Sequence, residues 1–108
     1  MRDLSCSDLD GAYLEGKNLR KADLTFSNMV EAHLRNADLR NANLHHADLR
    51  DADMTGANLT GAILTDADLR GALYDDETTF SDGFEPEARG MVHQEEHERH
   101  LERRRDAL

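Results

Sequence analysis

The residues best suited to chemistry in this chain are its histidines, its one cysteine and its aspartates. His45 and His46 are adjacent, and His93, His97 and His100 are spaced so that they would share one face of a helix. Imidazole and thiolate are ligands that zinc prefers in proteins. No cysteine and no third histidine completes a site with His45 and His46, so the sequence predicts no metal site there. Zinc binding by the three tail histidines is left open.

The sequence offers no catalytic constellation. The run from His93 to His97 is not the His-Glu-x-x-His protease motif, because glutamate must directly follow the first histidine. Cys6 has no neighbouring base that would activate its thiol. The aspartates recur at a fixed spacing, which gives them a structural explanation and singles out no catalytic pair. We therefore expect no enzyme activity, no catalytic or metal-binding residues and no cofactor.

Composition limits the partners and the compartment. The chain has 108 residues, the size of one domain, and a formal net charge of −10. Direct contact with nucleic acid or with an anionic membrane surface is therefore not expected. A single cysteine cannot form an internal disulfide, and the sequence shows no signal peptide and no long apolar run. These features predict a cytoplasmic protein.

The elements that must position these side chains are units of five residues. The unit reads Ala-(Asp/Asn)-Leu-x-x, and residues 36–50 carry it without a gap. On a helix, five steps of about 100° turn each leucine by roughly 140° from the last, so no apolar stripe forms. In a strand, five is odd, and successive leucines would alternate between faces. A chain that turns once per unit buries the same positions every time, which predicts a solenoid.

Each position of the unit has an expected role. The central residue should fill the axis, and the alanine two residues earlier should point inward where only a methyl group fits. The Asp or Asn between them can bond nearby backbone at a turn. The residue two after the leucine is often Gly, Asn or Asp, which are turn formers. The central residues are Leu4, Leu9, Leu14, Leu19, Leu24, Met29, Leu34, Leu39, Leu44, Leu49, Met54, Leu59, Leu64, Leu69 and Tyr74.

These units resemble the pentapeptide-repeat family. The resemblance covers residues 2–75 and continues into the sequence Tyr-Asp-Asp-Glu-Thr-Thr-Phe of residues 74–80. It implies an all-β fold, a right-handed quadrilateral β-helix with four units per coil and under four coils here. The residues alone do not separate a coil of four units from a coil of three. We expect a β-helix over 1–75, a C-terminal cap over 76–91 and a charged helical tail over 92–108.

The two ends of the ladder depart from the repeat. Arg2, Ser7 and Lys17 take the inward small position of the first coil. Either their side chains escape through an open end, or a partner or second copy covers that end. At the other end, apolar residues are expected to form a lid over the last leucine layer rather than an exposed contact patch. The lid residues are Ile63, Leu73, Tyr74, Phe80, Phe84, Pro86, Met91 and Val92.

The tail from Val92 to Leu108 is too poor in apolar residues to fold as an isolated helix. It is therefore either loosely attached or ordered by a second subunit. Removing the chain after Gly90 is accordingly expected to leave the β-helix folded. Relatives of the family dimerise through C-terminal elements, so a weak homodimer is left open here, through the tail or through the open N-terminal end.

The resemblance implies a non-catalytic scaffold that binds an unidentified protein partner. The alternative is a DNA mimic of the kind that binds DNA gyrase and protects it from quinolones. The chain departs from those relatives because it has few coils and no loop inserted in the repeat. With four units per coil, Asp48 and Asp68 would stack in an acidic column, but Arg50 and Arg70 lie beside them. The surface is therefore expected to be mixed in charge.

Overall fold

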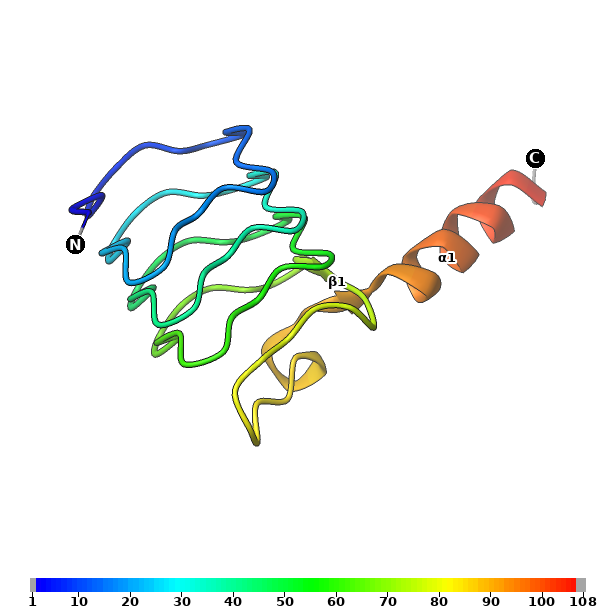
Figure 1. Cartoon of the computed structure of the whole chain (residues 1–108). Helices are drawn as coiled ribbons and strands as arrows, with labels where there is room; N and C mark the ends of the chain where they lie inside the picture. Colours follow the sequence, from blue (N-terminus) through cyan, green and yellow to red (C-terminus); the bar gives the residue numbers. More distant parts are fainter. Residues whose placement is uncertain (1, 107–108) are drawn as a thin grey trace.

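In the computed structural model, which describes residues 2–106, the chain winds into stacked coils and ends in a projecting helix (Figure 1). Parallel β-bridges join positions that stand four units apart in the sequence, from Asp3 with Asp23 to Asp53 with Leu73. Each coil therefore holds four of the five-residue units and has four walls. Pairing at this spacing decides between the four-unit and three-unit coils that the sequence left open. Leu108, at the end of the expected tail, lies outside the described residues.

Named secondary structure occurs only at the C-terminal end of the described chain. It comprises β1 (Leu73–Tyr74), the 3-10 helix η1 (Glu87–Arg89), β2 (Val92–His93) and α1 (Gln94–Asp106). In the repeat itself the pairing takes the form of isolated bridges, because a turn interrupts the extended backbone in every unit. Neighbouring coils are still joined by regular hydrogen bonds. The Leu44 N–H donates to the Ile63 carbonyl at 2.8 Å, and the Ala47 N–H donates to the Leu44 carbonyl across the turn at 2.9 Å.

The turns place one residue of each unit in the left-handed backbone region. This is the residue two after the leucine, as in a type II turn, and Phe26, His46 and Asp66 have φ values of 59°, 57° and 58°. Asn, Asp and His tolerate this region better than most side chains. The Asp or Asn before the leucine accepts from the backbone two residues later: Asn43 Oδ1 accepts from the His45 N–H at 3.1 Å. The expected turn role of that residue is confirmed.

The core is a ladder of leucine and alanine. The central residues from Leu19 onward are buried, and Leu24, Leu44 and Leu59 are at most 1% exposed. The inward alanines are as buried as the leucines in the middle of the ladder, which confirms both columns. Each alanine is buried because it faces the axis at a point where the next coil stacks directly on it. The space there accommodates a methyl group but no larger side chain.

Replacing Ala47 with leucine is expected to destabilise the fold by roughly 1–3 kcal/mol, because Ala47 is 1% exposed and added methylenes must displace packed neighbours. Chemical unfolding measures the loss. Ala88→Leu is the matched control, since Ala88 is exposed and its substitution should change stability by no more than about 0.5 kcal/mol. An Ala47→Leu protein as stable as the parent would contradict the inward placement of this column.

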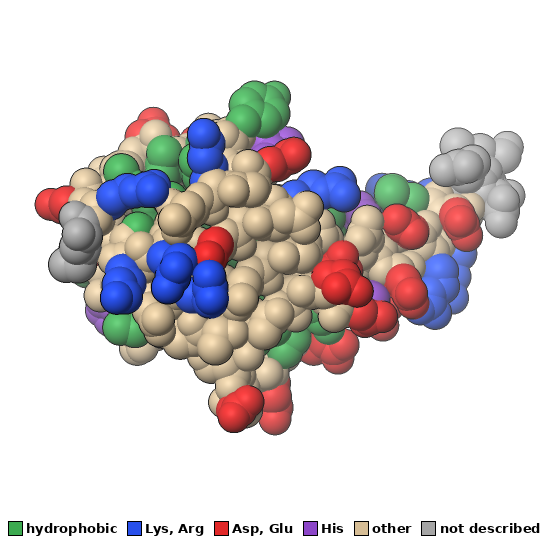
Figure 2. Space-filling view, viewed as in Figure 1, with side chains coloured by type: hydrophobic (Ala, Val, Ile, Leu, Met, Phe, Trp, Pro, Cys, Tyr) green, Lys and Arg blue, Asp and Glu red, His purple; other side chains and the backbone are tan. Residues whose placement is uncertain are grey.

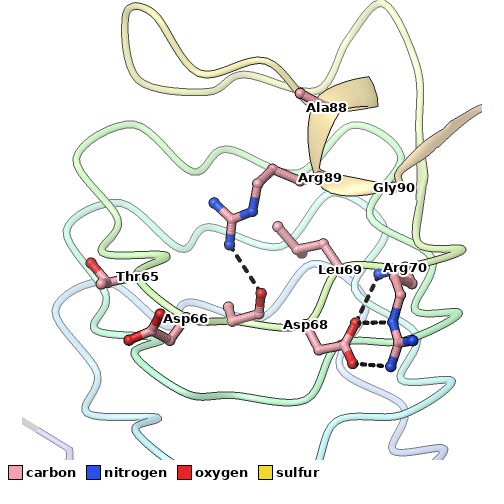
Figure 3. A pocket seen from close by; sticks show the side chains of 9 residues that line it. Thr65, Asp66, Asp68, Leu69, Arg70, Ala88, Arg89 and Gly90 are labelled. Atoms are coloured by element: carbon pink, nitrogen blue, oxygen red, sulfur yellow. Dashed lines mark hydrogen bonds and ion pairs between the residues drawn. The ribbon is translucent and has the colours of Figure 1, made fainter.

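The cap closes the C-terminal end of the ladder. The regular spacing of the repeat would pair Asn58 with Thr78, but Asn58 pairs with Thr79 instead. The segment 75–79 is therefore one residue longer than the corresponding segment of a regular unit, and Phe80 takes the next central position. The Arg89 guanidinium donates from Nη2 to the carbonyl oxygens of Leu64 and Ala67 at 2.8 and 2.9 Å. Figure 3 draws the second of these bonds. These bonds fasten η1 to the last coil.

Aromatic side chains fill the cap. The Tyr74 hydroxyl donates to Glu87 Oε1 at 2.9 Å, and burial together with this carboxylate raises the pKa of Tyr74 to about 12. Phe80 stacks on Phe84 with ring centroids 4.7 Å apart, and both pack against the core. The expectation that Ile63 joins this lid is wrong, because its side chain is 47% exposed. It occupies the outward position of the unit, where Asn43 stands one coil earlier.

The chain between the cap and the helix extends the solenoid. β2 pairs in parallel with β1, Leu73 facing Val92 and Tyr74 facing His93. The expected tail helix therefore starts at Gln94 rather than at Val92, because backbone pairing with the coil claims the two residues before it. α1 projects away from the coils, with the side chains of Glu95 to Arg104 exposed (Figure 1). No helix among residues 2–106 has the length and apolar character needed to cross a membrane.

The N-terminal end has no comparable cap among the described residues. Leu4, Leu9 and Leu14 are partly buried rather than buried, although they continue the central column. Arg2 and Lys17, which take the inward position of this coil, are exposed. Their charged groups therefore stay in water, as expected if they escape through the open end.

Candidate functional site

One wall of the solenoid carries His45 and His46, the adjacent histidines that the sequence singled out. Residues 23–26, 43–46 and 63–66 stack directly on one another, since Asp23 bridges Asn43 and Asn43 bridges Ile63. We call this the histidine wall. It is defined by the outward side chains of Phe26, His45, His46, Ile63 and Asp66.

The aromatic rings of the histidine wall pack together. Phe26 lies parallel to His46, with ring centroids 4.9 Å apart and an interplanar angle of 7°. His45 meets Phe26 edge-on at 5.9 Å and meets His46 edge-on at 4.4 Å. Phe26 nevertheless remains 58% exposed. The rings support one another and leave an aromatic surface open to solvent.

A carboxylate completes the group. Asp66 stands one coil after His46, and its Oδ2 lies 3.5 Å from His46 Nε2. One ligand atom from each of His45, His46 and Asp66 can be chosen so that all three lie within 4.8 Å of one another. Asp66 is not among the residues predicted from the sequence, because only a third histidine or a cysteine was considered as the remaining ligand. The available signal was the spacing of His46 and Asp66, which matches one coil of four units.

Cys6 begins the same column of turn positions. Its thiol is free and the residue is exposed, one coil before Phe26. Phe26 therefore separates Cys6 from the two histidines along the column.

The next wall carries paired charges. Arg50 Nη2 and Asp48 Oδ2 are 2.7 Å apart, and Arg70 Nη2 and Asp68 Oδ2 are 2.6 Å apart. The hydrogen bond from Arg70 lowers the pKa of Asp68 to about 2, so this carboxylate is ionised at neutral pH. The acidic column is thus interrupted by arginines at both aspartates. On the face shown in Figure 2, Lys and Arg gather over the N-terminal half, while Asp and Glu gather over the cap and helix.

The tail histidines do not form one helical face. His93 belongs to β2, before α1 begins, and its Nε2 lies 2.8 Å from Asp76 Oδ1. This hydrogen bond raises the pKa of His93. The predicted common face of His93, His97 and His100 is therefore wrong, because backbone pairing removes the first from the helix. Among the described residues, the only group of three potential metal ligands that converges is the one on the histidine wall.

Comparison with known proteins places the chain in a family. The model of pentapeptide repeats matches in eight copies, over residues 3–41, 18–56 and 37–73. The chain belongs to the pentapeptide-repeat family. Together these matches cover the coils and stop before the cap. No curated protein sequence matches the chain significantly.

Solved structures of other pentapeptide-repeat proteins are similar. One is Rfr23 from the cyanobacterium Cyanothece 51142, with 39% identity, a TM-score of 0.72, and coverage of 73% of this chain and 54% of that one. Another, from the thylakoid lumen of Arabidopsis thaliana, has 33% identity, a TM-score of 0.73, and coverage of 83% and 57%. This chain thus spans little more than half the length of both. Their family implies the quadrilateral β-helix.

A more distant structure shares the fold alone. It is trypsin-treated QnrB1, described as a plasmid-mediated fluoroquinolone resistance protein, at 17% identity and a TM-score of 0.52. The match covers 94% of this chain and 64% of that one.

Proposed function

We propose that this pentapeptide-repeat protein is a non-catalytic scaffold, a right-handed four-sided β-helix that binds a protein partner through its histidine wall. Phe26 is the observation that carries the proposal. The residue is 58% exposed, yet it is held at a turn whose backbone is bonded to the next coil, with the Phe26 N–H donating to the His45 carbonyl at 3.0 Å. An exposed aromatic ring on a rigid backbone loses little conformational entropy on binding, and aromatic residues are frequent hot spots of interfaces.

The composition of the wall supports the same function. Residues 23–26, 43–46 and 63–66 contain no lysine or arginine, and Ile63 adds an apolar side chain that is 47% exposed. The centres of protein interfaces are depleted in charged residues, since each charge must be desolvated on binding. A partner that covered the neighbouring wall would have to remove water from its Asp–Arg pairs and disrupt those ion pairs.

Catalysis is not part of the proposal. Neither of the two similar pentapeptide-repeat structures is named as an enzyme. The converging groups of the histidine wall lie on an outward surface rather than in a closed cleft that excludes water. A cytoplasmic location is proposed with the scaffold function, on the basis of the single cysteine.

The DNA-mimic alternative has weaker support. A mimic of DNA needs an uninterrupted series of negative charges, whereas Arg50 and Arg70 pair with the aspartates of the acidic column. A gyrase supercoiling assay separates the two functions. The scaffold proposal expects no change in supercoiling when the protein is added, and specific inhibition would favour the alternative.

The partner contact is tested with a double variant, Phe26→Asn with Ile63→Asn. Asparagine tolerates the left-handed backbone at residue 26, and it stands at the position of Ile63 one coil earlier, so the fold should be retained. Proteins recovered from the native host with the parent chain are purified and titrated against both forms. We expect the variant to bind at least about 30-fold more weakly, which corresponds to losing one hot spot of about 2 kcal/mol.

Tyr13→Asn is the matched control for this experiment. Tyr13 is 80% exposed, stacks on His33 and lies half a coil away from the histidine wall. Its replacement should leave the affinity unchanged. Equal binding by the parent and the double variant would contradict the proposal. Loss of binding only in Tyr13→Asn would instead place the contact on the wall that carries Tyr13.

A further inference from the structure

We propose that His45, His46 and Asp66 bind a divalent transition-metal ion, with Zn²⁺ as the reference occupant. The inference concerns the chain alone and does not depend on the proposed protein partner. It follows from the position of three ligand groups on the coils, from the contacts that hold them, and from the absence of a competing arginine at Asp66 among the described residues.

The coil repeat places two of the ligands. His46 and Asp66 occupy the same left-handed turn position in successive coils, with φ of 57° and 58°. Coils stack at the spacing of paired strands, about 4.8 Å, so these side chains leave the wall side by side. His46 Nε2 and Asp66 Oδ2 are already 3.5 Å apart. His45, in the adjoining turn position, brings a third ligand atom within 4.8 Å of both.

These separations are close to those of an occupied site. Nitrogen and oxygen ligands lie about 2.0–2.2 Å from zinc, so two of them at tetrahedral angles are about 3.3–3.5 Å apart. The His46–Asp66 pair already has this spacing. His45 has to approach by at most roughly 1.3 Å, which rotation of a side chain provides without moving the backbone.

The backbone of both histidines and the ring of His46 are held in place before any ion arrives. The His46 N–H donates to the Thr65 carbonyl at 3.1 Å, which links the two coils beside the site. The His45 N–H donates to Asn43 Oδ1 at 3.1 Å. Phe26 lies flat against the His46 ring. Less side-chain freedom is therefore lost on binding than for histidines on a flexible loop.

Asp66 differs from the aspartates near it. Asp48 and Asp68 are held by Arg50 and Arg70, whereas within residues 2–106 the ion pair of Asp66 is with His46 alone. Figure 3 shows the Asp66 carboxylate pointing away from Arg89, while Asp68 faces Arg70. Among the described residues, no guanidinium has to be displaced before Asp66 can bind a cation.

The donor set indicates the class of ion. Two imidazoles and one carboxylate favour Zn²⁺, Cu²⁺, Ni²⁺ or Co²⁺, whereas Mg²⁺ and Ca²⁺ prefer oxygen ligands alone. Three protein ligands leave one position of a tetrahedral ion open, and this position faces solvent on the histidine wall.

The test is titration of the full chain with Zn²⁺ by calorimetry, and with Co²⁺ by visible absorption. We expect one ion per chain at this site and no binding of Mg²⁺ at equal concentration. His46→Asn and Asp66→Asn keep residues that tolerate the left-handed backbone. His45→Thr introduces the residue that occupies the same position in both neighbouring coils, Thr25 and Thr65. Each variant should bind Zn²⁺ at least about tenfold more weakly, the smallest loss expected even for an outer-shell group.

Two controls test the histidines of α1 and the single cysteine as competing ligands. The double variant His97→Ala with His100→Ala, and Cys6→Ser, should bind Zn²⁺ as the parent does. The Co²⁺ complex should show no thiolate-to-metal charge-transfer band. Thermal melting without metal confirms that every variant is folded. Parent-like Zn²⁺ affinity in His46→Asn and Asp66→Asn would overturn the proposal, as would loss of binding only in the tail or Cys6 variants.

Discussion

Replacing Leu44 with aspartate is expected to prevent folding altogether. Leu44 is fully buried on the axis in the middle of the ladder, with coils on both sides. A carboxylate there loses its hydration and meets only aliphatic side chains, so the cost is several kcal/mol even if the group becomes protonated. That cost is comparable with the whole stability of a small domain, about 5–15 kcal/mol. Circular dichroism should show loss of the β signal and of the melting transition.

Two further variants separate charge burial from lost packing. Leu44→Ala leaves a cavity and should reduce the free energy of unfolding by roughly 2–5 kcal/mol while the chain still folds. Leu101→Asp makes the same change as Leu44→Asp at a leucine of α1 that is 43% exposed, and it should leave the melting transition of the coils unchanged. A cooperatively melting Leu44→Asp protein would contradict the buried ladder.

Ending the chain after Gly90 is expected to destabilise the coils by about 3 kcal/mol or more. The cut removes Met91, which is 4% exposed and whose burial contributes roughly 1.5–3 kcal/mol. It also removes β2, whose Val92 N–H donates to the Ala72 carbonyl at 2.8 Å. The sequence predicted that this cut would be tolerated, and the packing of Met91 and Val92 reverses that expectation. Chemical unfolding of the shortened chain measures the loss.

Ending the chain after His93 provides the control. This cut keeps the β1–β2 pairing and removes only α1, whose described side chains from Glu95 to Arg104 are exposed. Its stability should match that of the full chain. Sedimentation of the same protein tests the weak homodimer: a full chain that sediments as a dimer and a shortened chain that sediments as a monomer would place the contact on α1. Equal stability of the two shortened chains would contradict the role of β2 in the cap.

Much of the fold could be predicted because its information is local. The period of five identifies which residues face the axis, since every unit repeats the same turn and neighbouring units experience the same packing. The buried Leu44 and Ala47 and the turn at Phe26 all follow from position within the unit. The family membership also follows from these residues, because the repeat is the signature that the family model matches.

Two predictions that rested on residue type were wrong. Ile63 was assigned to the lid from its apolar character, but its place in the unit directs it outward. Val92 and His93 were assigned to a helix from the charge pattern of the tail, but β1 offers an unpaired edge that they fill. For Ile63 the position in the repeat prevailed over residue type, and for Val92 and His93 a tertiary contact did.

The candidate site depended on one quantity that the repeat does not contain, the number of units in a coil. With three units per coil His46 would stack on Gly61, whereas with four it stacks on Asp66. The sequence determined that His46 and Asp66 both stand at outward turn positions, because the five-residue period sets the turns. Only the tertiary structure decided that they are neighbours, because hydrogen bonds between coils, rather than any local preference, set which turns stack.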